Sequence, residues 1–511
     1  MHGRVKVRTT EEERERKKKE HALKVRAYRA AMGRILKKRD AGELDDEMLG
    51  LTVQILQRNP DVSTLWNIRR ECVLAKTKQL SDAGAESNKS DEVQVEAEAE
   101  AVAEVVEKPV EREDKLQAVY DQELTLTEQC LMVNPKSYNA WHHRCWTLEQ
   151  NPQADWQREV QLCNKYLKYD ERNFHTWDYR RYVSAKAAVP AEQELDFCTE
   201  KIKVNFSNYS SWHHRSLLLP KLYPNEQRDR PMSEEKLQQE LEMVLTAAFT
   251  DPNDSSAWFY QRWLLGGGVQ VDQAPKVVAF RVGATGAVVA FNKPCPDFEQ
   301  FRVELASNEH TWQLQSWQPA DSSRTTWKTQ TSIDYHKERS YSLKLSEQEI
   351  KLLPLATGDG AFYFVPPNAA SSCSKELFEE LQTQLQSCFD LLEYEPDSKW
   401  TLLTSALLMR AIDVTANHER SLDHLVQLEK FDGLRAGYYK DLAACWTLEL
   451  ELAKWVTSAT FPKRFELAAE SALTALPYGQ YLAIADELEL PAALKEELGD
   501  RLPQTFAELK L

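Results

Sequence analysis

One short phrase recurs along this chain and limits its fold more than any other feature. It consists of a turn led by Asn, Asp or Glu, then a Trp, and then an Arg three residues further on. Four copies fit this pattern, around Trp66, Trp141, Trp177 and Trp212. A fifth copy contains Trp258 with its Arg one position late, at Arg262, and a worn sixth copy contains Trp400. The central copies repeat every 36 and 35 residues, so the sequence predicts a tetratricopeptide-like array of αα-hairpins.

The residue types of the phrase explain why it repeats. An Asn-Pro or Asp-Pro step ends one helix and turns the chain, and an Asn, Asp or Ser before the Trp can cap the next helix. An apolar residue lies four positions before each Pro position, which gives the preceding helix an inner stripe. The Trp and the Arg lie one turn apart on one helix face. We therefore interpret both as packing and ion-pair residues of the repeat.

Composition excludes several classes of protein. The chain has 511 residues, of which 42% are hydrophobic, and this indicates a mostly folded chain of about three domains. Its nine Cys form no CxxC pair and no zinc-ligand spacing, which is typical of reduced thiols in an intracellular protein. No apolar run reaches the ~20 residues of a membrane span. We therefore expect a cytoplasmic protein with no transmembrane segment and no metal site of its own.

The net charge of −16 is unevenly distributed along the chain. Residues 81–114 hold twelve Asp and Glu against three Lys and Arg, and we interpret them as an acidic, disordered insertion between two hairpins. Residues 1–40 carry fifteen Lys and Arg against six Asp and Glu. Both signs mix within residues 11–20, as on an exposed helix face, so we expect no nucleic-acid partner.

The middle of the chain changes from helical to strand-like patterns. After a helical domain at 1–268, β-branched runs separated by turn residues occur at 276–292, 301–305, 311–317, 324–330, 339–345 and 361–365. They predict a small antiparallel β-sandwich, inserted at 269–370. Helical repeats resume at 371–445. Residues 446–511 form a short C-terminal extension, whose Leu spacing indicates either a truncated leucine-rich repeat or a remnant folded differently.

The repeat phrases resemble those of the α subunits of protein prenyltransferases. The phrase Asn-Pro-Lys-Ser-Tyr at 134–138, continued by Trp-His-His-Arg at 141–144, carries the resemblance first. The phrases at 170–181, 205–213 and 251–260, together with the inserted sandwich, are most similar to the α subunit of Rab geranylgeranyltransferase. Two features depart from that pattern. Vertebrate relatives carry a full leucine-rich-repeat domain where only 446–511 remain here, and the acidic insertion has no counterpart.

The resemblance implies a crescent-shaped array that works as one half of a heterodimer. The β subunit would hold the catalytic Zn²⁺ and the isoprenoid pocket. The implied reaction transfers geranylgeranyl from geranylgeranyl diphosphate to C-terminal cysteines of Rab GTPases, with Rab escort protein as a further partner. A family lysine that reaches the diphosphate matches Lys136, and the tyrosine beside it matches Tyr138. The family position lining the same edge is His175, and a more speculative assignment directs His2 toward the β-subunit zinc.

Two other functions remain open at the level of sequence. The chain could be the α subunit shared by the farnesyl and type I geranylgeranyl transferases, although the inserted sandwich and Lys136 argue against this. It could also be a non-catalytic helical-repeat scaffold that only docks proteins, which would not require a lysine at 136.

Overall fold

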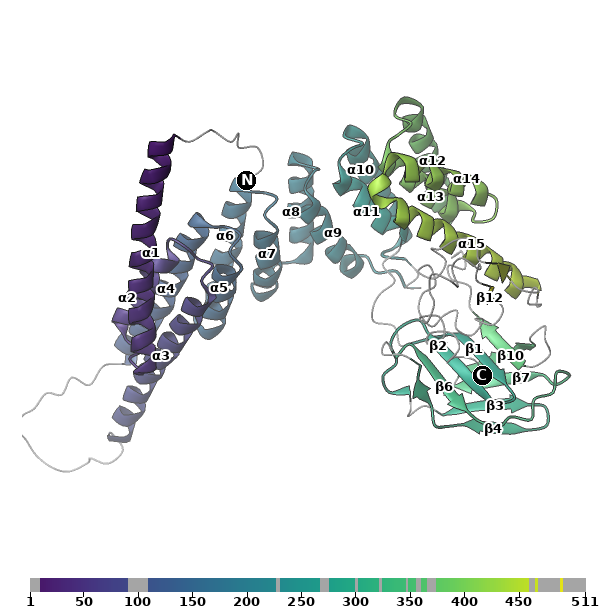
Figure 1. Ribbon diagram of the computed structural model, residues 1–511, viewed down its shortest axis with the longest axis horizontal. Coiled ribbons are helices and arrows are strands. Elements are labelled where there is room, and N and C mark those ends of the chain that lie inside the picture. The colour runs from purple at the N-terminus through teal and green to yellow at the C-terminus, as the bar shows by residue number, and fades with distance from the viewer. Residues whose placement is uncertain are drawn as a thin grey trace, which may run out of the picture. The chain divides into compact units, whose positions relative to one another are not determined.

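The computed structural model describes most of the chain and divides it into two units, residues 1–197 and 198–511. The described residues are 10–90, 109–226, 230–266, 275–298, 302–320, 324–345, 348–354, 360–364, 374–458, 465–466 and 488–489. Helices dominate both units, and strands gather in one region of the second (Figure 1). The prediction of a mainly helical repeat protein with an inserted antiparallel sheet region is confirmed.

The first unit begins with a long charged helix and continues as helical hairpins. Helix α1 buries only Ile35, because charged residues surround it on every side. The helices are α1 (Glu11–Asp40), α2 (Asp46–Leu56), α3 (Ser63–Ser90), α4 (Pro109–Val133), α5 (Tyr138–Gln150), α6 (Trp156–Tyr169), α7 (Phe174–Lys186) and the start of α8 (Ala191–Val204). Neighbouring helices such as α4 and α5, or α6 and α7, pack side by side as pairs.

The second unit continues the repeat on both sides of the strands. Before the strands lie the end of α8, α9 (Tyr209–Leu222), α10 (Glu234–Thr250) and α11 (Ser255–Gly266). After them come α12 (Lys375–Tyr394), α13 (Lys399–Ile412), α14 (His418–Phe431), the 3-10 turn η2 (Gly433–Arg435) and α15 (Ala436–Ser458). The helical repeats therefore resume at Lys375, four residues after the predicted start at 371.

Five hairpin turns are built from the same two bonds. At the α4–α5 turn, Asn134 Oδ1 accepts the backbone N–H of Lys136 at 3.1 Å. The indole N–H of Trp141 then donates to the carbonyl oxygen of Pro135 at 2.9 Å, six residues earlier. The same indole bond joins Trp66 to Pro60, Trp177 to Glu171, Trp212 to Phe206, and Trp258 to Pro252. All five indoles are buried, so the Trp packs the array and also closes its own turn.

The Arg of the phrase joins each hairpin to the next. Arg144 donates through Nε and Nη2 to both carboxylate oxygens of Glu159, at 2.7 Å each, on the first helix of the following hairpin. Its Nη1 donates backwards to Thr127 of its own hairpin at 2.9 Å. The equivalent pairs are Arg69–Glu123, Arg180–Glu194 and Arg215–Glu240. These carboxylates are themselves buried, which confirms the ion-pair interpretation of the Arg.

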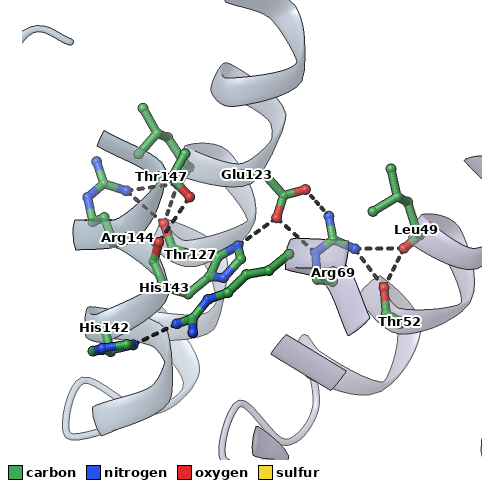
Figure 2. A network of polar contacts seen from close by, with 11 residues as sticks. Leu49, Thr52, Arg69, Glu123, Thr127, His142, His143, Arg144 and Thr147 are labelled. Atoms are coloured by element: carbon green, nitrogen blue, oxygen red, sulfur yellow. Dashed lines mark hydrogen bonds and ion pairs between the residues drawn. The ribbon is translucent and has the colours of Figure 1, made fainter. Parts of the chain in front are cut away.

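A second side chain from the receiving hairpin also binds the carboxylates of Glu123, Glu159 and Glu240. Figure 2 shows Glu123 between Arg69 of α3 and His143 of α5, whose Nε2 lies 2.8 Å from the carboxylate. In the next junctions a tyrosine hydroxyl replaces the imidazole: Tyr179 donates to Glu159 and Tyr260 to Glu240. The residue two positions after the Trp supplies this donor to the junction with the preceding hairpin. The Arg three positions after the Trp forms the ion pair with the following hairpin, so one repeat phrase contributes to two junctions.

The fifth junction replaces the ion pair with neutral amides. The position three residues after Trp258 is Gln261, and its side chain is fully buried. Its Nε2 donates to Oε1 of Gln384 on α12 at 2.8 Å. The expectation that Arg262 takes the Arg role one position late is therefore wrong. One position along a helix rotates the side chain by about 100°, and Arg262 instead contacts the hydroxyl of Tyr438.

The strands form two antiparallel sheets around one core. They are β1 (Val277–Gly283), β2 (Gly286–Phe291), β3 (Val303–Ser307), β4 (Thr311–Leu314), β5 (Gln318–Pro319), β6 (Thr326–Gln330), β7 (Tyr341–Leu345), β8 (Gln348–Lys351), β9 (Leu353–Pro354) and β10 (Gly360–Phe364). The sheet orders are β5-β6-β2-β1-β10-β9 and β4-β3-β7-β8. Phe280 and Trp327 of the first sheet share a buried cluster with Leu343 of the second. The strands that the sequence missed, β5, β8 and β9, are edge strands too short to show alternation.

Two predicted boundaries need correction. Helix α3 continues to Ser90 and α4 begins at Pro109, so 81–90 and 109–114 of the predicted disordered insertion are helical. A proline is favoured at the first helical position, and Val119 and Tyr120 of α4 bury against Val73 of α3. Residues 91–108 lie outside the described residues.

The helical array also passes its predicted end at residue 445. Helix α15 runs to Ser458, because Trp446 is buried and Glu449 forms an ion pair with Arg410 at 2.6 Å. Beyond it, β11 (Phe465–Glu466) pairs in parallel with β12 (Leu488–Glu489). Parallel strands one repeat apart are the pairing that successive leucine-rich repeats make. That interpretation of the extension stays a prediction, since the intervening residues lie outside the described part.

Replacing Trp177 with Ala should lower the free energy of unfolding by about 3–5 kcal/mol, because it empties a fully buried indole site. Trp177→Phe is the matched control: it keeps an aromatic ring but loses the bond to Glu171, and should lose about 1 kcal/mol. Chemical denaturation measures both. A Trp177→Ala variant that unfolds like the wild type would contradict the packing role.

Changing Gln384 to Glu should cost about 3 kcal/mol of stability at neutral pH, because a buried carboxylate would face an amide instead of a cation. Adding Gln261→Arg supplies that cation and should recover at least half of the loss. Denaturant unfolding of the single and double variants gives the comparison. If the double variant is no more stable than Gln384→Glu, the amide pair is not the neutral equivalent of the ion pairs.

Candidate functional site

The three residues singled out in the sequence lie together at adjacent hairpin turns. Lys136 belongs to the α4–α5 turn, Tyr138 begins α5, and His175 is the second residue of α7. The rings of Tyr138 and His175 meet edge to face, with centroids 4.3 Å apart. Lys136 Nζ lies 3.8 Å from Oδ2 of Asp170, which leads the neighbouring turn. We call Lys136, Tyr138 and His175 the candidate cluster.

Bonds between the turns fix this arrangement. Ser137 caps α5 by accepting the backbone N–H of Ala140 at 3.3 Å, and this sets the direction in which Tyr138 leaves the helix. The side-chain amide of Asn173 donates to the carbonyl oxygen of Pro135 at 3.0 Å and accepts the N–H of His175. One asparagine therefore caps α7 and ties its turn to the turn that holds Lys136.

The members of the cluster differ in burial. The side chain of Lys136 is 62% exposed and Tyr138 is 68% exposed, whereas His175 is only 7% exposed. Phe174 stacks on the His175 ring at 4.0 Å. Burial lowers the pKa of His175, Asp178 opposes that shift, and the charge of Lys136 adds to it. In the cluster, the Lys136 ammonium and the Tyr138 phenol are therefore accessible to solvent, and the Tyr138 ring packs against a buried, mainly neutral His175 imidazole.

Exposed apolar residues recur at equivalent positions of several hairpins, and sequence reasoning did not single them out. Just before each turn lies an exposed side chain, namely Val133 (55%), Tyr169 (74%), Val204 (77%) and Tyr394 (84%). Three residues before the Trp lie Tyr138, Phe174 and Tyr209, also exposed. Aligning the repeat copies would have revealed both series. Repeated exposure of large apolar groups is typical of a surface that a partner covers.

Two further predictions from the sequence concern His2 and the absence of a transmembrane segment. His2 lies outside the described residues, and its assignment stays a prediction. No helix in the described residues is long and apolar enough to cross a membrane.

Comparisons with known proteins match this chain over most of its length. The family model "Protein prenyltransferase alpha subunit repeat" matches residues 120–151, 156–187, 191–222 and 237–267. Geranylgeranyl transferase type-2 subunit alpha of Bos taurus is 39% identical over 483 residues, 89% of this chain and 77% of the relative. The Homo sapiens protein of that name is 38% identical over 519 residues, 96% of this chain and 83% of the relative. Among solved structures, Candida albicans protein geranylgeranyltransferase-I complexed with GGPP gives a TM-score of 0.41 at 14% identity, covering 81% of this chain and 89% of that chain.

The pH dependence of stability should report the burial of His175. Its unfolded imidazole titrates near the ordinary pKa of 6.5, and the folded one below it. The unfolded state therefore binds more protons, and stability should fall as the pH drops below that value. The free energy of unfolding at about pH 7.5 and about pH 5.5 should change less in His175→Asn than in the wild type. His21→Asn, on the exposed part of α1, is the control, and equal changes in all three proteins would contradict the assignment.

Proposed function

This chain belongs to the protein prenyltransferase α subunits of the geranylgeranyl transferase type-2 kind, and we propose that it is the α subunit of a heterodimeric Rab geranylgeranyltransferase. The enzyme would transfer geranylgeranyl from geranylgeranyl diphosphate to C-terminal cysteines of Rab GTPases presented by a Rab escort protein. The identity of 38% over 96% of the chain carries the proposal. Two matched family repeats, 120–151 and 156–187, contain the candidate cluster, which supports a role at the reaction site.

The candidate cluster would act on the leaving group. Negative charge grows on the diphosphate as its bond to the isoprenoid carbon breaks. We propose that Lys136, an exposed cation on a rigid turn, lies at the edge of the β subunit's isoprenoid site and stabilises that charge. The exposed hydroxyl of Tyr138 would donate a further hydrogen bond. His175 would hold the Tyr138 ring at its edge, so that phenol and ammonium keep a fixed spacing.

The zinc ion of this reaction is proposed to lie on the β subunit. In the parts of this chain that the structure describes, no three His, Cys, Asp or Glu side chains gather as metal donors. Burial raises the pKa of its thiols, for example that of Cys163 to about 12. When bound by the β subunit, zinc would hold the acceptor cysteine as a thiolate. The contribution of this chain would be charge and hydrogen-bond donors.

The exposed apolar positions support an obligate partner. Tyr169 and Val133 flank the turns that hold Lys136 and Asp170, and Tyr138 and Phe174 begin the next helices. A β subunit that covers these residues would bury large apolar side chains around the candidate cluster. Such burial is the usual source of affinity in permanent interfaces.

The two alternative functions named from the sequence can be compared with these observations. Both relatives described above are named as type-2 α subunits, which disfavours the α subunit shared by the farnesyl and type I enzymes. A docking scaffold without a catalytic contribution would tolerate loss of Lys136, and the following experiment separates it from the proposed function.

Changing Lys136 to Ala should leave assembly with the β subunit unchanged and slow single-turnover transfer to a Rab about a hundredfold, because one placed charge on a leaving group is worth that much. Lys136→Arg should recover part of the rate, since its planar group reaches differently. Rapid-quench measurements on the purified heterodimer give the rate constants.

Lys430→Ala is the control, because this lysine is likewise exposed but lies in the last turn of α14. It should transfer at the wild-type rate. If Lys136→Ala transfers within about threefold of the wild type, against that expectation, the lysine is a bystander and the chain acts as a scaffold.

A further inference from the structure

Arg70 occupies an unusual position next to the first buried ion pair. It lies on α3, one residue after Arg69, and its side chain crosses to α5. Arg70 Nη2 is 2.6 Å from Nδ1 of His142, and its guanidinium carbon lies 5.6 Å from the centre of the Trp146 ring. Its Nε is buried without a hydrogen-bond partner among the described residues.

No carboxylate balances this guanidinium within the part of the chain that the structure describes. Arg69 pairs with Glu123, and Arg181, at the position equivalent to Arg70 two hairpins later, pairs with Asp178. Among these residues Arg70 contacts the His142 imidazole and the face of Trp146. Partial burial without a counter-ion lowers the pKa of Arg70. A half-buried positive charge that lacks an anion is costly in the free chain and is a strong site for one.

The contact with Arg70 also prepares His142 as a donor. A guanidinium can only donate, so Nδ1 of His142 must accept, and the imidazole proton then resides on Nε2. His142 is exposed. His142 therefore anchors one edge of the Arg70 guanidinium, and its own N–H donor faces away from Arg70.

The surroundings of Arg70 favour a protein partner. Tyr138, His142 and Trp146 follow one another at four-residue steps along α5, so Tyr138 of the candidate cluster lies on the same face of α5 as the two residues that Arg70 contacts. Leu74, one turn after Arg70 on α3, is an apolar residue that is 49% exposed. An arginine stacked on Trp and bordered by exposed apolar residues has the composition of an interface hot spot.

From these observations we infer that Arg70, His142 and Trp146 form a receptor site for an aspartate or glutamate side chain of the β subunit. The inference rests on the proposed function, because it takes its partner from there. The carboxylate would accept from the N–H groups of the guanidinium that do not face His142, supplying the counter-ion that Arg70 lacks. Trp146 would hold the guanidinium plane in place while its edge binds the carboxylate.

The test is subunit exchange of the purified heterodimer. Arg70→Gln should weaken the heterodimer at least about thirtyfold, mainly through faster dissociation, as loss of a hot spot does. Arg70→Lys, which keeps the charge but loses the planar fork, should fall in between. Arg181→Gln is the matched control, because its partner Asp178 lies within the chain, and it should dissociate at the wild-type rate.

A charge-reversal pair identifies the partner residue. Arg70→Glu should dissociate fastest, and changing one Asp or Glu of the β subunit to Arg should restore affinity to it alone. Thermal melting of each variant confirms that the chain is folded. Exchange of a folded Arg70→Gln heterodimer within threefold of the wild type would overturn the inference.

Two further outcomes separate this inference from the proposed function. If Arg70→Gln leaves exchange unchanged but weakens binding of geranylgeranyl diphosphate, the site binds the diphosphate and the interface assignment is wrong. If the wild-type chain assembles with no prenyltransferase β subunit, the proposed function is wrong. If a folded Arg70→Gln chain assembles normally and supports normal transfer, only the inference about the Arg70 site is wrong.

Discussion

The buried pairing of an arginine with the glutamate of the next hairpin is the constraint on which the repeat depends. Arg144 has both forked nitrogens on Glu159 and its third nitrogen on Thr127, so its guanidinium is bonded on each side. Breaking one partner would leave a charge stranded in the core. Because Arg and Glu stand at the same repeat positions in four junctions, each hairpin accepts its neighbour in one register. At Gln261 the same geometry persists with amides, which shows that the position, rather than the charge, is the common element.

That register decides what the turns can do. Stacking the hairpins brings the turn before α5 next to the turn before α7, and Asn173 bonds directly across to Pro135. Lys136 and His175 therefore become neighbours although 39 positions separate them along the chain. The Trp keeps each turn rigid by bonding back to it, so an exposed lysine sits on a fixed support. The role that we propose for Lys136 needs such a support, since a mobile ammonium would lose its advantage to water.

Much of the fold could be predicted because short-range physics repeats in the sequence. The Trp spacing, the capping residues and the β-branched runs between turn residues are all local signals, and the structure agrees with them. Predictions from local signals were wrong where a contact with a residue distant in the sequence determines the structure. Arg262 looked like a displaced member of its series, yet only helix geometry shows that Gln261 points into the junction. Helices α3 and α4 extend into the predicted insertion, and next to it they bury Val73 against Tyr120, a pairing of residues distant in the sequence.

The sequence by itself determined the repeat length, the Trp and Arg positions and the insertion of a strand-rich segment, and the family resemblance added the prediction of a lysine, a tyrosine and a histidine as site residues. Tertiary structure alone decided which carboxylate each arginine meets, that the cluster residues touch, and that Arg70 meets none of the described carboxylates. The physical reason is that composition and periodicity report how one segment relates to its own helix or strand. Contacts, burial and the balance of charge depend on the stacking of separate hairpins, and the sequence expresses that stacking only through residues far apart along the chain.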